Sequence, residues 1–123
     1  MELHDIRNEM DIRLLVDQFY VHARVDPLLA PVFNHWIGDD WSKHLPIMYS
    51  FWNNVLFHQG GYKGNPMLVH QHIHQQNPLS AQHFERWLQL WTTTARQHFK
   101  GPQLENMIQR AESIAQIMQQ KLF

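Results

Sequence analysis

Residues 80–99, SAQHFERWLQLWTTTARQHF, decide the fold of this chain. Large apolar side chains recur there every three or four positions, at Phe84, Trp87, Leu88, Trp91, Ala95 and Phe99. That spacing places all of them on one face of an α-helix, whereas a strand would show alternation. Ser80 can cap the start of this helix, and Gly101 followed by Pro102 ends it.

The segments nearer the two ends of the chain show the same helical spacing. Residues 9–25 carry an apolar stripe made of Met10, Ile12 or Arg13, Leu14, Val16 or Asp17, Phe19, Tyr20 and Ala23. A final helix runs from about residue 103 to the end. Two prolines, a glycine and an aspartate pair break residues 26–41 into short helical turns joined by loop.

The middle of the chain adds two further helices. One starts at or just after Ser42, with Pro46 close to its beginning, where a missing N–H matters least. Pro66 starts a short helix that runs through His70 and ends before residue 77. Almost nothing alternates like a strand, so we predict a single all-α domain over residues 1–123.

Charge and composition limit the possible partners. Ten Lys and Arg face eleven Asp and Glu, and no basic block occurs, which argues against a nucleic-acid or anionic-membrane surface. No segment reaches the roughly 18 apolar residues of a membrane span, and the N-terminus lacks a signal-peptide core. We therefore expect a cytoplasmic monomer that binds a small molecule.

The chain contains no cysteine. This excludes disulfides, thiolate metal sites, a catalytic thiol and covalent haem attachment through C-x-x-C-H. Any redox chemistry must come through histidine or a bound cofactor.

Three of the ten histidines lie in residues 67–74, MLVHQHIH, and three interpretations compete. In the first, His70, His72 and His74 form a metal patch, but only His70 and His74 share a helix face and no carboxylate is near in the sequence. In the second, all three are solvated loop residues, an interpretation that suits His72 and His74 best. Alternatively, His70 alone is an axial ligand to a flat cofactor.

The axial-ligand interpretation requires polar groups on the far side of the cofactor. Tyr20, His44 and Trp87 occupy inward positions of three different helices and can donate hydrogen bonds to a ligand that gains negative charge. Singly, each is as well explained as a core aromatic or a solvated histidine. The three donors occur together with His70 and with three aromatic residues that can form the walls of a pocket, and this combination favours a cofactor site. The wall residues are Phe33, Phe51 and Trp52.

The order of these motifs resembles the truncated haemoglobins. It comprises Phe19-Tyr20, PVFN at 31–34, Trp41 and His44, Phe51-Trp52, Tyr62 with Gly64, Pro66 and His70, and Phe84 with Trp87. Among these proteins the chain is most similar to the third group, which lacks the paired-glycine motifs of the others. The resemblance extends from about Phe19 to the C-terminus.

The resemblance implies a shortened globin fold, with helices packed two over two around a b-type haem and a proximal helix of about one turn. It implies that His70 is the proximal iron ligand and that Tyr20, His44 and Trp87 are distal residues. It also implies a set of haem contacts: Phe33 against the porphyrin, Met48, Phe51 and Trp52 as pocket wall, and Tyr62 and Lys63 near a propionate. Pro46, directly beyond His44, is a departure that affects where the distal helix begins.

A histidine-ligated haem leaves one iron position free for O₂, NO or CO. A polar distal side suggests tight O₂ binding, or nitric-oxide dioxygenase or peroxidase-like chemistry with a separate reductase, since the chain has no flavin or nicotinamide motif. The alternative is a non-haem, histidine-ligated helical metalloprotein, which would normally show Glu-x-x-His spacing. Neither the ELH at residues 2–4 nor the HFER at residues 83–86 fits that spacing.

Overall fold

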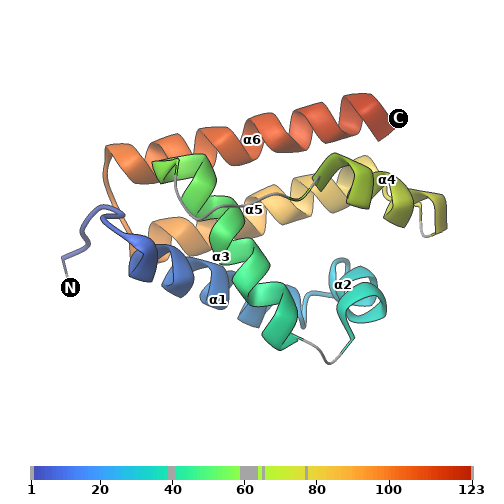
Figure 1. Ribbon diagram of the computed structural model, residues 1–123, viewed down its shortest axis with the longest axis horizontal. Helices are drawn as coiled ribbons and strands as arrows, with labels where there is room; N and C mark the ends of the chain where they lie inside the picture. The colour runs from blue at the N-terminus through green and yellow to red at the C-terminus, as the bar shows by residue number, and fades with distance from the viewer. Residues whose placement is uncertain (1, 39–40, 59–63, 65, 77, 123) are drawn as a thin grey trace.

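The computed structural model describes residues 2–38, 41–58, 64, 66–76 and 78–122. Within these residues the chain forms helices and no strand (Figure 1), which confirms the all-α prediction. The helices are α1 Glu9–Ala23, α2 Ala30–Ile37, α3 Trp41–Phe57, α4 Pro66–Gln76, α5 Ala81–His98 and α6 Pro102–Leu122. None of these described helices is both long and apolar enough to cross a membrane.

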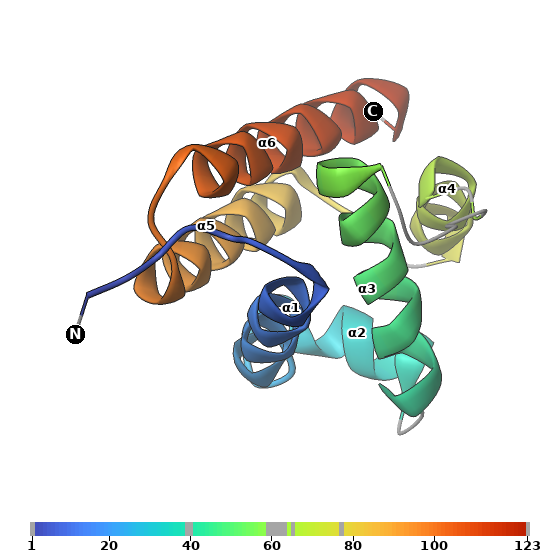
Figure 2. The same cartoon turned by 60° about the vertical axis from the view of Figure 1, so that its left-hand side comes forward.

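Four helices pack in two pairs. Helix α1 contacts α3, α5 contacts α6, and the pairs meet where α1 packs on α5 and α3 packs on α6. The two short helices, α2 and α4, lie on the side away from the N-terminus in both views (Figures 1 and 2). This arrangement is the two-over-two packing that the resemblance implied.

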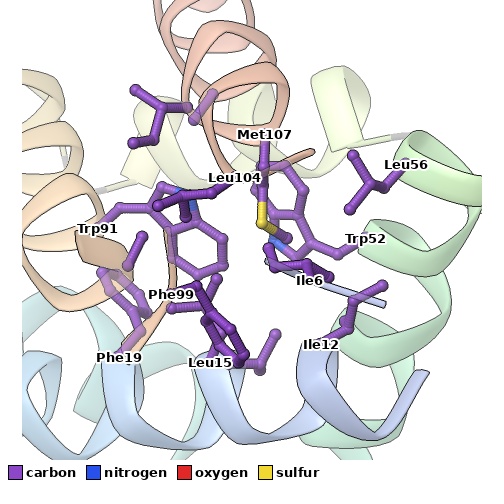
Figure 3. Close-up of a cluster of buried hydrophobic side chains, with 14 of the residues drawn as sticks. Ile6, Ile12, Leu15, Phe19, Trp52, Leu56, Trp91, Phe99, Leu104 and Met107 are labelled. Atoms are coloured by element: carbon purple, nitrogen blue, oxygen red, sulfur yellow. The ribbon is translucent and has the colours of Figure 1, made fainter. Parts of the chain in front are cut away.

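The core lies between the paired helices and is dominated by large rings (Figure 3). Phe19 of α1 and Trp91 of α5 are each 1% exposed, and Trp52 of α3 stacks on Trp91 with 4.7 Å between ring centroids. Leu104 and Met107 of α6 close the cluster. The predicted inward face of residues 80–99 is therefore correct, because Phe84, Trp91, Ala95 and Phe99 are all buried.

The predicted inward face of α1 is wrong in part. Its members Phe19, Tyr20 and Ala23 are buried as predicted, but Met10 and Leu14 are 69% and 43% exposed, and Leu15, which was not predicted to face inward, is fully buried. Apolar residues occupy two overlapping stripes on this helix, and packing against α3 and α5 selects the stripe that contains Phe19.

Helix α4 starts at Pro66 and ends at Gln76, before residue 77 as predicted, but its 11 residues exceed the single turn that the resemblance implied. His72 and His74 are therefore helical residues and not part of a loop. Pro78 is the first proline after Pro66, and a proline disfavours helical backbone at the residue before it. Helix α3 begins one residue earlier than predicted, at Trp41, so that Pro46 lies inside it.

The N-terminal segment fixes the start of α6. The carboxylate of Asp5 accepts hydrogen bonds from the backbone N–H groups of Gln103 and Leu104, both at 2.9 Å. Gly101 has φ +146°, and a Cβ there would lie 2.5 Å from Asp5 Cγ, so glycine alone fits beneath the carboxylate. Ile6, next to Asp5, is buried in the core.

Replacing Asp5 by alanine should therefore weaken the fold. Two donors at the N-terminus of α6 lose their acceptor, and we expect the free energy of unfolding to fall by roughly 1–2 kcal/mol, as for other helix N-caps. Urea unfolding followed by circular dichroism measures this. Glu2→Ala removes the same charge from an exposed position of the same segment, and an equal effect of both substitutions would contradict the capping role.

Candidate functional site

A cavity of about 390 Å³ lies among the helices, and all six of them contribute to its wall. Most of the lining side chains are aliphatic or aromatic, and no Lys, Arg, Asp or Glu occurs among the described lining residues. A large apolar cavity with a few polar groups is typical of a cofactor site.

The cavity brings together every predicted site residue that the structure describes. These are His70, Tyr20, His44, Trp87, Phe33, Met48, Phe51 and Trp52. The two predicted propionate contacts, Tyr62 and Lys63, lie outside the described residues.

His70 reaches the cavity from α4 with its tautomer set by the backbone. Its Nδ1–H donates to the carbonyl oxygen of Pro66 at 2.7 Å, which leaves the lone pair on Nε2. Burial lowers the pKa of His70, although the bond to Pro66 opposes this shift, so the ring is neutral at pH 7. A neutral imidazole oriented through its second nitrogen is the usual form of a histidine metal ligand.

Tyr20 and His44 form a hydrogen-bonded pair in the cavity wall. The Tyr20 hydroxyl on α1 lies 3.1 Å from His44 Nε2 on α3. Burial raises the pKa of Tyr20 and lowers that of His44, so both side chains are uncharged at pH 7. In Figure 2, α3 lies between α1 and α4, so this pair and His70 enter the cavity from different helices.

Helix α3 accommodates Pro46 without displacing His44. Proline lacks the N–H that would bond one turn back, yet α3 is continuous from Trp41 and His44 still lines the cavity. Pro46, which departs from the family pattern, therefore does not prevent His44 from contacting Tyr20.

Packed rings hold the polar groups in place. Phe33 and Trp41 meet the ring of Tyr20 edge-on, with centroids 5.5 and 5.0 Å away. Trp87 lies parallel to Trp91, with centroids 6.3 Å apart, and its Nε1 makes no hydrogen bond to any residue that the structure describes. Rings confined in this way have little freedom to turn away from the cavity.

An ion pair that the sequence analysis did not predict connects helix α5 with the turn that precedes α2. Asp26 is 5% exposed and accepts hydrogen bonds from Arg86 Nε at 2.7 Å and from the N–H groups of Leu28 and Leu29. Burial alone would raise the pKa of Asp26, but Arg86 and the two backbone donors hold it below its usual value. This pair links Leu29 to the segment that carries Trp87, and both residues line the cavity.

The other two histidines of residues 67–74 make contacts with neighbouring segments. His72 meets the ring of Trp36 edge-on at 5.4 Å, and His74 Nδ1 accepts the N–H of Leu79 at 2.9 Å. Among the described residues no group of three His, Cys, Asp or Glu could hold a metal ion. The interpretation of these histidines as a local metal patch finds no support.

Comparison with known proteins gives two matches over almost the whole chain, although no family model matches it. Group 3 truncated hemoglobin ctb of Campylobacter jejuni is 30% identical over 119 residues, which cover 94% of this chain and 91% of the relative. The crystal structure of group III truncated hemoglobin from Campylobacter jejuni has a TM-score of 0.91 and 29% identity, covering 99% of this chain and 96% of that one. These similarities agree with the helical packing described above.

The lowered pKa of His44 should make the fold sensitive to acid. The unfolded chain takes up a proton on His44 near pH 6.5, whereas burial resists this in the folded chain. The contribution of His44 to the free energy of unfolding is therefore complete above about pH 6.5 and is lost as the pH falls below it. Urea unfolding at pH 7 and pH 5 should show a smaller loss for His44→Gln than for the parent chain or for His22→Gln, an exposed control. Equal losses in all three would rule out this linkage.

Proposed function

The chain belongs to the group III truncated haemoglobins, globin-type haem proteins that bind small gases, and we propose that its cavity holds a b-type haem with His70 Nε2 as the iron ligand. The observation that carries this proposal is the hydrogen bond from His70 Nδ1 to the Pro66 carbonyl inside an apolar cavity. The bond prepares one nitrogen as a base and fixes the direction of the ring.

The residues present fit this cofactor. A flat macrocycle needs apolar walls, which Phe33, Met48, Phe51 and Trp52 supply. The chain has no cysteine, so neither a thiolate ligand nor thioether attachment competes with histidine ligation of a b-type haem. When bound, the haem iron supplies an open coordination position for O₂, NO or CO.

We propose that Tyr20 and Trp87 stabilise the bound gas by donating hydrogen bonds to it. Burial keeps the Tyr20 hydroxyl protonated, and the Trp87 N–H has no described partner. In an apolar cavity such donors interact strongly with negative charge that develops on a ligand. The Tyr20 hydroxyl has one proton, so it keeps that proton for the gas when His44 Nε2–H donates to the Tyr20 oxygen across the 3.1 Å contact and so positions it.

Donors of this kind favour retention of O₂ over its delivery. Catalytic reaction of the bound gas with nitric oxide, or of the haem with peroxide, would also need electrons from a separate reductase, because the sequence carries no flavin or nicotinamide motif.

Removal of the Tyr20 hydroxyl should speed O₂ release. In the reduced, haem-loaded protein we expect Tyr20→Phe to raise the O₂ dissociation rate about tenfold, the effect of losing one hydrogen bond to a charged group. Stopped-flow displacement of O₂ by CO measures this rate.

Tyr49→Phe is the matched control. Tyr49 bonds Asp17 and does not line the cavity, so its loss should leave O₂ release unchanged. An unchanged rate in Tyr20→Phe, or an equal increase in Tyr49→Phe, would remove Tyr20 from the distal role.

A further inference from the structure

One imidazole in the cavity wall has no part in the proposed function. Tyr20, His44 and His70 account for three of the polar groups, and His83 of α5 is a fourth. The described lining residues include no Lys or Arg, so His83 is the imidazole with no assigned role that can meet a charged part of a ligand there.

The N-terminus of α5 fixes the tautomer of His83. The backbone N–H of Ser80 donates to His83 Nδ1 at 3.0 Å, and Ser80 Oγ lies 2.9 Å from the same nitrogen. Because Nδ1 accepts these bonds, the proton resides on Nε2. His83 Nε2 makes no hydrogen bond to any residue that the structure describes.

His83 lies where the cavity meets solvent. Its ring is half-buried, while Phe84 beside it is 7% exposed and belongs to the interior. Ser80, which holds the ring, is exposed, and Leu79 before it lines the cavity. A donor at this edge can meet a polar group of a ligand whose remaining surface is buried.

A b-type haem has that distribution of polarity. Its macrocycle is apolar, and two propionate carboxylates project from one edge. A carboxylate accepts N–H donors strongly, and an interaction at the rim avoids the cost of burying the charge. We propose that His83 Nε2–H donates a hydrogen bond to a haem propionate and thereby anchors the carboxylate edge at the junction of α4 and α5; this inference rests on the proposed haem function.

Two substitutions separate this role from helix capping. His83→Glu retains an acceptor for the Ser80 N–H, as in a capping box, but removes the donor and adds a negative charge. His83→Gln also retains the acceptor and supplies an amide N–H. Each variant is loaded with haem and, separately, with haem dimethyl ester, which lacks the carboxylate charges. The measured quantity is the rate of haem loss to excess apomyoglobin.

We expect His83→Glu to lose haem roughly tenfold faster than the parent protein and His83→Gln to stay within about threefold of it, since its amide still donates. With the dimethyl ester, both variants should match the parent. An equal increase for haem and its ester, or no increase with haem, would overturn the anchoring role. If the parent protein fails to bind haem stoichiometrically, the proposed function itself is overturned. If the parent binds haem tightly and His83→Glu loses haem at the parent's rate, only this inference is overturned.

Discussion

The stacking of Trp91 against both Trp52 and Trp87 is the interaction on which core and cavity both depend. Trp52 comes from α3 and the other two rings from α5, so the stack sets the separation of these helices. All three rings line the cavity, and Trp91 also packs in the core with Leu104 and Met107. The cavity wall is thus continuous with the core, and substitutions in either should be felt in the other.

Burial in this wall keeps the polar groups uncharged. It raises the pKa of Tyr20 and lowers those of His44 and His70, so a hydroxyl donor and two neutral imidazoles coexist at pH 7. Backbone bonds then select the tautomers: the Pro66 carbonyl holds the proton of His70 on Nδ1 and leaves Nε2 as the base, and the Ser80 N–H leaves the proton of His83 on Nε2. The same apolar surroundings that suit the proposed macrocycle therefore also keep the proposed ligand and hydrogen-bond donors in the required protonation states.

Periodicity and breakers in the sequence predicted five of the six helices, because apolar spacing reports which face is buried, but they gave residues 26–41 only as short turns where α2 forms. The grouping of the site residues came from the family resemblance. The inward face of α1 was wrong at Met10 and Leu14, because two apolar stripes overlap on this helix. The resemblance implied one turn for α4, which instead continues to Gln76 because its first opposing proline is Pro78. Asp5 and Asp26 escaped notice because their partners lie 98 and 60 residues away. His83 was judged only by metal-ligand spacing, whereas its capping bond to Ser80 and its place in the cavity wall appear only in the folded chain.

The most direct test of the account is the absorption spectrum of the haem-loaded protein in its ferric, ferrous and CO-bound forms, compared with His70→Ala and His72→Ala. His72 lies on the same helix but does not line the cavity, so its loss controls for removing an imidazole from α4. The account predicts a histidine-ligated spectrum in the parent and in His72→Ala, and its loss in His70→Ala. An unchanged spectrum in His70→Ala would contradict the assignment of the iron ligand and, with it, the proposed orientation of the site.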